Sequence, residues 1–354
     1  MNPTDIFSFF EEQKTKGVDL VLATVCETKG STYSKIGSYM LISNEGLFYG
    51  LLSGGCLEGD LAERAKEVLK NNQSQQVTYD LSQNDDLLWG LGVGCDGLMR
   101  IFLQPLLSKN NYEPFASIRD NMLANRSGVF VTVIESSDHK NISASAVGTD
   151  HSFHNFNIQS SLIPTIKKEI LNVIQCKESS LQDIEVDGQT STVLYTILKP
   201  LPKILILGAG LDAEPIVRMS AEFGWRITIQ DHRLAYIEKG NFGTASSVHC
   251  VPVKSLSKEI NLEEFDAAIV MSHHIEVDRD YLKILASTSI PYIGLLGPKE
   301  RKNKILGELG EAASSLKDRL YGPAGLDIGG RGPSTIALSI VSQIHQELIS
   351  RKVL

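Results

Sequence analysis

A cysteine that follows two glycines is the residue in this sequence best suited to chemistry. Cys56 comes after Gly54 and Gly55, and Glu58 lies two residues later. A cysteine thiolate is a nucleophile and a ligand for soft metals, and its pKa falls below about 8.5 at a helix start. We therefore treat Cys56 as a candidate ligand and Glu58 as a candidate for handling a proton. In the alternative, the glycines only make a turn and Cys56 is a small buried apolar residue, and the residues leave both open.

The residues around this cysteine predict a strand before it and a helix after it. An apolar run over residues 47–52 predicts the strand, and apolar side chains at three- and four-residue spacing over 57–70 predict the helix. The first amides of a helix have no partner inside it and favour an anion. The sequence therefore predicts a ligand-binding loop at this junction, made of Ser53, Gly54, Gly55, Cys56 and Glu58.

A second cysteine lies among four glycines between residues 90 and 97. This is Cys95, and such a density of glycine suits a loop pressed against a ligand or another backbone. If the fold brings Cys56 and Cys95 together, two thiolates face one soft metal or one sulfur-rich cofactor. Two unrelated tight turns are the alternative, and the sequence does not decide between them.

The first part of the chain predicts a mixed α/β domain. Two prolines in residues 199–203 mark the linker that ends it, so we expect domains over residues 1–198 and 199–354. Short apolar runs predict its strands and apolar periodicity predicts its helices. The strands are expected over 18–26, 38–43, 47–52, 76–81, 98–103, 128–135, 143–147 and 190–198, and the helices over 4–16, 57–70, 113–125 and 162–175.

The second part alternates strands with helices, which is typical of a Rossmann-like, doubly wound parallel sheet. Strands are expected to begin at 204, 226, 267 and 292, and a last helix to run over 333–348. Gly208, Gly210 and Asp231 match the dinucleotide-binding fingerprint in outline, so NAD is an open candidate cofactor. Two acids and a proline near the start of the next helix argue against a bound pyrophosphate, namely Asp212, Glu214 and Pro215.

Two histidines follow the strand expected over 267–272. His273 and His274 are therefore expected at the ligand-bearing edge of the sheet, where imidazoles bind metals or carry protons. Together with thiolates such as that of Cys56, they form a candidate metal site. Helix capping with an exposed imidazole is the equally open alternative.

Composition sets limits on the partners of this chain. Its 354 residues are 42% hydrophobic and 21% charged, and its formal net charge is −8 at pH 7. An acidic chain without a basic run is not expected to bind nucleic acid or an anionic membrane. No apolar segment is long enough to span a membrane, and no secretory signal is visible at the start. The five widely spaced cysteines do not form a disulfide pattern, so we expect a cytoplasmic protein.

These motifs together resemble the XdhC/CoxI family, the accessory factors of xanthine dehydrogenase and related molybdenum hydroxylases. The resemblance rests on several short segments spread over most of the chain. They are residues 29–32 (Lys-Gly-Ser-Thr), 53–59 (Ser-Gly-Gly-Cys-Leu-Glu-Gly), 94–97, 208–210, 231–233, 271–274, 292–297 (Tyr-Ile-Gly-Leu-Leu-Gly) and 322–327. The chain departs from the family at Tyr33-Ser34, where a Pro-Arg pair is common, and at Leu211, where a histidine is common.

The resemblance implies a cofactor chaperone more than a turnover enzyme. Family members bind molybdenum cofactor (molybdopterin), protect it during sulfuration and deliver it to an apo-hydroxylase, working with a cysteine desulfurase. It implies that Cys56 is the cofactor ligand, with Cys95 as a second candidate, and that the protein forms a homodimer. An NAD-dependent oxidoreductase and a metal-dependent enzyme remain the alternative hypotheses.

Overall fold

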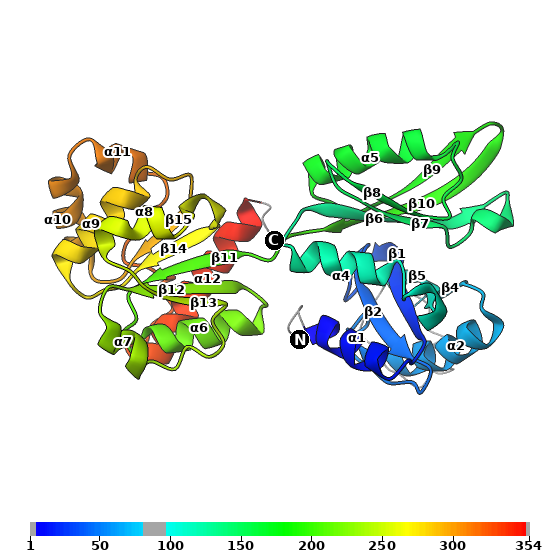
Figure 1. The fold of residues 1–354 in the computed structure, drawn as a ribbon, viewed down its shortest axis with the longest axis horizontal. Coiled ribbons are helices and arrows are strands. Elements are labelled where there is room, and N and C mark those ends of the chain that lie inside the picture. The colour runs from blue at the N-terminus through cyan, green and yellow to red at the C-terminus, as the bar shows by residue number, and fades with distance from the viewer. Residues whose placement is uncertain (1–4, 81–96, 352–354) are drawn as a thin grey trace. The chain divides into compact units, whose positions relative to one another are not determined.

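The computed structural model describes residues 5–80 and 97–351. They form two compact units, residues 5–200 and residues 201–351, which we call the N-terminal and C-terminal units (Figure 1). The glycine-rich run around Cys95 lies outside the described residues.

Two antiparallel five-stranded sheets make up the N-terminal unit. The first sheet has the order β3 (Phe48–Tyr49), β2 (Tyr39–Ser43), β1 (Leu20–Gly30), β5 (Gly97–Leu106) and β4 (Gln75–Asp80). The second has the order β8 (Phe153–Phe156), β7 (Ser145–Gly148), β6 (Gly128–Ser136), β10 (Gln189–Leu198) and β9 (Ser180–Val186). The helices are α1 (Asp5–Thr15), α2 (Glu58–Asn71), α4 (Phe115–Leu123) and α5 (Ile163–Cys176), with short turns η1 (Ser108–Asn110) and η2 (His139–Asn141).

Alternation of side chains along β1 explains the layers of this unit. Val21, Ala23 and Val25 pack with α2 in one core cluster. Leu20 and Leu22 point the other way, into a cluster that also contains side chains of the second sheet. The outer face of the second sheet is covered by α5 (Figure 1). The layers therefore run from α2 through the two sheets to α5.

Aromatic side chains anchor α1 and α4 to the core between the sheets. The Phe115 ring of α4 is fully buried and contacts the rings of Phe7 and Phe10, with centroids 6.3 and 5.0 Å away. It also meets the Tyr39 ring edge-on at 6.1 Å. One side chain thus joins two helices to β2.

The C-terminal unit is a parallel six-stranded sheet between helices. The strand order is β13 (Ser247–Cys250), β12 (Arg226–Asp231), β11 (Lys203–Leu207), β14 (Ala267–Val270), β15 (Tyr292–Leu295) and β16 (Leu320–Tyr321). The helices are α6 (Ala213–Glu222), α7 (Leu234–Lys239), α8 (Leu256–Glu259), α9 (Ile275–Leu285), α10 (Lys299–Leu309), α11 (Ala312–Leu316) and α12 (Pro333–Ser350), with short turns η3 (Val253–Ser255) and η4 (Leu262–Glu264). The strand order reverses between β11 and β14, which is the usual ligand position in such a sheet.

Both faces of this sheet are apolar, as a parallel sheet covered by helices requires. Ile204 and Ile206 of β11 face α6 and α12, and Leu205 and Leu207 face the side of α9 and α10. The expected fold class is confirmed: a mixed α/β N-terminal part precedes a Rossmann-like parallel sheet. Within the described residues, no helix has both the length and the apolar character needed to cross a bilayer.

The strand expected over residues 47–52 is shorter than its apolar run. Only Phe48 and Tyr49 pair with β2, because the chain turns away at Gly50 with φ of +112°. A side chain at Gly50 would lie 2.8 Å from the Met40 backbone, so this turn requires glycine. The sequence also missed β8, β9, β13 and β16, which are short or carry little apolar alternation.

We expect Phe115→Ala to destabilise the protein by about 3–5 kcal/mol, because it leaves a cavity where two helices meet the sheet. Urea unfolding followed by circular dichroism measures this change. As a control, Leu171→Ala removes an exposed leucine from α5 of the same unit and should change stability by about 0.5 kcal/mol or less. Equal effects of the two substitutions would contradict the role given to Phe115.

Candidate functional site

The loop between β3 and α2 holds Cys56 at the start of a helix, as the sequence predicts. Gly54 and Gly55 have φ of +74° and +109°, a backbone region that favours glycine. A side chain at Gly55 would meet no atom within 4 Å, so the backbone is open there. The two glycines thus let the chain curl while one side of the loop stays accessible.

The Glu58 carboxylate lies inside this loop and organises it. Its Oε1 accepts hydrogen bonds from the amides of Leu52 at 2.8 Å and Ser53 at 2.9 Å. Its Oε2 accepts from the amides of Gly55 at 2.9 Å and Leu57 at 3.2 Å. The Ser53 hydroxyl donates to the same oxygen at 2.5 Å and accepts from the Leu57 amide at 2.7 Å. The Glu58 side chain therefore binds the backbone of four loop residues between Leu52 and Leu57.

This arrangement corrects the expectation that an outside anion occupies these amides. Four of them already donate to Glu58, which is only 1% exposed. Burial alone would raise the pKa of Glu58, but the hydrogen bonds from Ser53 and Leu52 outweigh burial and hold its pKa below the ordinary value of 4.5. The side chain is therefore ionised near neutral pH and is a poor proton carrier.

Cys56 lies at the boundary between this loop and the core. Its thiol is free and half-buried, and its side chain packs against the apolar cluster under α2. It is therefore neither sealed in the core nor fully exposed. In this position the thiol can contact a bound molecule on its solvent side while its other side packs against the core.

The loop over residues 31–37 borders the cysteine loop. The Tyr33 ring covers Gly54, where a side chain would lie 3.3 Å from the ring. The Ser34 hydroxyl donates to the Leu51 carbonyl at 3.3 Å. A side chain at Gly97 would collide with the carbonyl oxygen of Ser31, so the start of β5 lies against the same loop. Sequence reasoning missed the contact of Tyr33, since an exposed aromatic residue gives no positional signal.

Two lysines near this loop differ in their partners. Lys29 pairs with Glu27 at 3.1 Å, whereas Lys35 is exposed and has no ion pair to any described residue. Of these two lysines, Lys35 is therefore the one whose charge is not paired with a described carboxylate.

In the C-terminal unit, the glycines of the dinucleotide-like motif allow close approach between loops. Gly208 has φ of +127°, and a side chain there would lie 2.5 Å from the Met271 carbonyl oxygen. A side chain at Gly210 would lie 2.5 Å from Asp212 Oδ1 and 3.6 Å from the His273 ring, an ordinary contact distance. The loops after β11 and β14 therefore meet at the point where strand order reverses.

Asp231 lies in this region but its carboxylate is already engaged. It is fully buried and accepts hydrogen bonds from the Ala209 amide at 2.8 Å and from Arg233 through the backbone and the guanidinium. Burial would raise the pKa of Asp231, but the Arg233 guanidinium and these amides hold it below its ordinary value. In this arrangement the carboxylate is not presented to a ribose hydroxyl. Sequence analysis included Arg233 in the family segment over residues 231–233 but did not predict its pairing with Asp231.

His273 pairs with Asp212 at the crest of the sheet. Its Nε2 lies 2.8 Å from the Asp212 carboxylate, its side chain is 56% exposed, and its backbone has φ of +63°. His274 is also exposed and precedes α9. Within residues 5–80 and 97–351, no group of three or more His, Cys, Asp or Glu side chains could hold a metal ion. Cys56 belongs to the N-terminal unit and the two histidines to the C-terminal unit, so the metal site expected from Cys56, His273 and His274 stays a prediction.

The buried carboxylate of Asp278 holds the loop after β14, which carries the two histidines. Asp278 accepts hydrogen bonds from the amide and hydroxyl of Ser272 at 3.1 and 2.5 Å. Arg301 donates to its other oxygen at 2.5 Å. Arg301 was missed because nothing in its sequence context marks it.

The described predicted residues thus form two groups, one around Cys56 and one around Gly208, and each group belongs to a different unit. Cys95 lies outside the described residues.

We expect Glu58→Gln to lower the free energy of unfolding by about 2–4 kcal/mol near neutral pH, because the charged acceptor is lost. The folded pKa of Glu58 is depressed, so its contribution is present above 4.5 and is lost as pH falls through the folded pKa. Urea unfolding at about pH 7 and about pH 3 should show the wild type and the variant converging in acid. The exposed Glu63 of α2 offers the control Glu63→Gln, which should stay near wild type at both pH values. A difference independent of pH would contradict this role.

NADH should not bind measurably up to about 1 mM. Asp231 is engaged by Arg233, and the Asp212 carboxylate lies at the start of α6, where a pyrophosphate would need positive potential. Titration of NADH fluorescence measures binding, with a nicotinamide-dependent dehydrogenase as the positive control. Saturable binding in the micromolar range would contradict this interpretation.

Sequence comparisons place these features among known proteins. Residues 14–80 match the sequence model described as "XdhC and CoxI family", and residues 204–344 match that of the "XdhC Rossmann domain". A Bacillus subtilis protein named as a probable subunit of xanthine dehydrogenase is 30% identical over 328 residues, which are 93% of each chain. The Escherichia coli "Molybdenum cofactor insertion chaperone PaoD" is 20% identical and covers 97% of this chain and 89% of its own.

A solved structure agrees with this placement. A Bacillus halodurans protein, described as a xanthine dehydrogenase, superposes with a TM-score of 0.80 at 30% identity and covers 99% of this chain and 97% of its own. The fold, the two matching regions and the full-length relative lead to one conclusion. This chain belongs to the XdhC and CoxI family.

Proposed function

We propose that this protein is an accessory factor that binds molybdenum cofactor and assists its sulfuration and its insertion into a xanthine dehydrogenase-type hydroxylase. Two full-length relatives support this proposal by name, one named for xanthine dehydrogenase and the other as a molybdenum cofactor insertion chaperone. The cofactor is cargo in this account: the protein holds it, delivers it and does not turn it over.

The observation that carries the proposal is the setting of Cys56. Its thiol is half-buried, it sits on a loop held by Glu58, and the backbone beside it at Gly55 is open. Thiolate is a ligand that suits soft metal centres. A ligand on a rigid loop loses little conformational freedom when the cargo binds, so one sulfur atom can contribute usefully to affinity.

The phosphate of the cargo needs contacts other than the amides that Glu58 occupies. Lys35 is the nearby exposed cation without an ion pair among the described residues, and Ser34 keeps its loop against Leu51. Few metal–sulfur bonds and few fixed anion contacts fit a carrier that must also release its cargo. We include Cys95 as a second sulfur ligand, as the family resemblance implies.

The proposed partners are an apo-hydroxylase that receives the cofactor and a cysteine desulfurase that supplies sulfide. Bound through Cys56, the cofactor would stay on an accessible face of the N-terminal unit. A second protein could then approach it without unfolding the carrier. We also propose that the carrier acts as a homodimer.

Cys56→Ser should reduce bound cofactor by about tenfold or more, because an alcohol replaces the soft thiolate ligand. Protein co-expressed with cofactor biosynthesis is assayed for molybdenum by mass spectrometry and for pterin by fluorescence after oxidation. Cys176→Ser is the matched control, since Cys176 is an exposed free cysteine of the same unit, and it should load like the wild type.

Equal loading of Cys56→Ser and wild type would contradict the role of Cys56. A wild-type protein that never carries pterin, and that leaves a co-expressed xanthine dehydrogenase-type enzyme unchanged in activity, would contradict the proposed function itself.

A further inference from the structure

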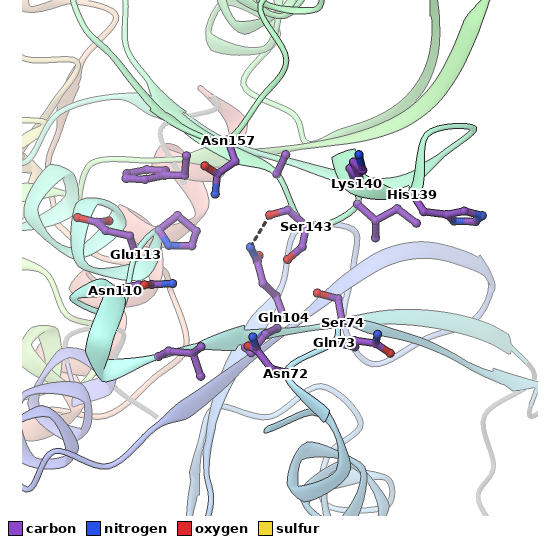
Figure 2. Close-up of a pocket in the computed structure, with 16 residues that line it drawn as sticks. Asn72, Gln73, Ser74, Gln104, Asn110, Glu113, His139, Lys140, Ser143 and Asn157 are labelled. Carbon is purple, nitrogen blue, oxygen red and sulfur yellow. Dashed lines mark hydrogen bonds between the residues drawn. The ribbon is translucent and has the colours of Figure 1, made fainter. Parts of the chain in front are cut away.

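Two surface features take no part in the proposed carrier function. One is a groove of about 630 Å³ in the N-terminal unit, where the Gln104 side chain donates to the Ser143 carbonyl at 3.0 Å (Figure 2). Its lining is rich in neutral amides and hydroxyls, which suit many polar molecules equally and single out none. The other feature is the outer face of α12 in the C-terminal unit, and its residue pattern does indicate one partner.

The 18-residue helix α12 carries almost no charge. Glu347 is its only Asp, Glu, Lys or Arg residue, and it pairs with Arg351 at 3.7 Å. A helix that covers a sheet normally has charged residues on the side that faces water. The inner side of α12 is apolar and packs in the core, through Ala337, Ile340, Val341, Ile344 and Leu348. The outer side thus lacks the charges that usually mark contact with water.

A narrow stripe on the outer side of α12 is apolar at both ends. Leu338 and Ile349 are 50% and 51% exposed, and Ser342 and His345 lie between them. The steps along this stripe are four, three and four residues. At about 100° per residue, the four side chains therefore share a sector of about 60°. This is the spacing of the contact positions in a pair of packed helices. We call these four residues the α12 stripe.

Exposed apolar side chains extend the α12 stripe onto its neighbours. Phe223, at the end of α6, is 47% exposed, and its ring centroid lies 5.9 Å from that of His345. The loop before α12 also lies against the helix, because the Leu326 amide donates to the Ser339 carbonyl at 3.1 Å. Ile328 of this loop is 50% exposed. The apolar surface is therefore wider than the helix alone.

The α12 stripe is symmetric about its own midpoint, which lies between residues 343 and 344. If a second α12 packs antiparallel across that point, Leu338 meets the partner's Ile349, and Ser342 meets the partner's His345. Apolar side chains then face apolar ones, and polar side chains face polar ones. A twofold axis requires such self-complementarity, because each copy presents the same patch. An unrelated protein has no need of this symmetry, so the pattern favours a second copy of this chain.

Charge favours the same partner. The chain has a formal net charge of −8 at pH 7, so two copies repel each other over much of their surface. The α12 stripe contains no acidic residue, and a twofold contact there brings no two carboxylates of the stripe together. It is therefore a surface on which two acidic chains can meet without this cost.

We propose that two copies of this chain associate through α12, packed antiparallel across a twofold axis. A helix of this length is about 27 Å long and 10–12 Å across, which gives a footprint of about 300 Å² on each copy. Stable interfaces bury about 800 Å² on each partner, so Phe223 and Ile328 must contribute and the dimer is expected to be weak. We expect a dissociation constant in the micromolar range. The inference assigns a surface to the homodimer proposed above, and it requires no bound cofactor.

Sedimentation velocity of the full-length protein, from about 1 to about 100 μM, measures this association. The wild type should pass from monomer to dimer within that range. Leu338→Glu should weaken the dimer by about tenfold or more, because the twofold axis places two unpaired carboxylates in the contact. Leu338 is half exposed in the single chain, so the variant should fold, which circular dichroism verifies. Leu171→Glu is the matched control, since Leu171 is an exposed leucine of α5, and it should associate like the wild type.

Cysteine cross-linking tests the antiparallel orientation. In the double variant Leu338→Cys/Ile349→Cys, the two new thiols of one chain are about 16 Å apart along the helix, too far for a disulfide within the chain. Oxidation should give a covalent dimer in which peptide mass spectrometry finds position 338 joined to position 349. Leu338→Cys alone should give no dimer linked through position 338.

A wild type that stays monomeric up to about 100 μM would assign the α12 stripe to another partner and overturn the proposal. A dimer unaffected by Leu338→Glu, or a cross-link that joins position 338 to position 338, would also overturn it. Cys56→Ser should associate like the wild type. The carrier function and this interface can therefore fail separately, since cofactor loading tests one and sedimentation tests the other.

Discussion

The hydrogen bonds from five donors to the Glu58 carboxylate hold together the loop on which the functional account depends. A glycine-rich turn at a helix start exposes several amides that need an acceptor. Glu58 supplies that acceptor from within the chain, and Ser53 adds a second link to Leu57. Gly54 and Gly55 can therefore adopt left-handed conformations without leaving the loop loose. Cys56 is displayed on a framework that exists before any ligand arrives.

Buried carboxylates also accept hydrogen bonds from loop amides in the C-terminal unit. Asp231 accepts the Ala209 amide after β11, and Asp278 accepts the Ser272 amide after β14. Both carboxylates are fully buried, and each is also paired with an arginine. Loops that would otherwise bind phosphate are thus held by the protein's own acids. The two units therefore present pre-organised loops, and an incoming anion has to find cations such as Lys35 instead of free amides.

The sequence predicted the parts of this protein that follow from local pattern. The apolar alternation along β1 and the helical spacing in α2 are visible in the sequence because side chains that share one face recur at a fixed spacing. The position of Cys56 between a strand and a helix was also predictable. The inward turn of Glu58 was not, because an acid in a first helical turn satisfies the helix dipole whether it faces inward or outward. Asp231 looked like a ribose acceptor for a similar reason, since its contact with Arg233 depends on side-chain direction. The groove lined by Gln104 and Ser143 depends on how two sheets meet, and no local pattern encodes that.

Whether Cys56 is the cargo ligand can be measured directly by alkylation of the protein with and without cofactor. Iodoacetamide treatment followed by peptide mass spectrometry reports each cysteine separately, and the exposed Cys176 serves as the internal reference. The account predicts that Cys56 is modified in the cofactor-free protein and protected in the loaded protein, while Cys176 reacts equally in both. Equal modification of Cys56 in both samples, with cofactor demonstrably bound, would contradict the account.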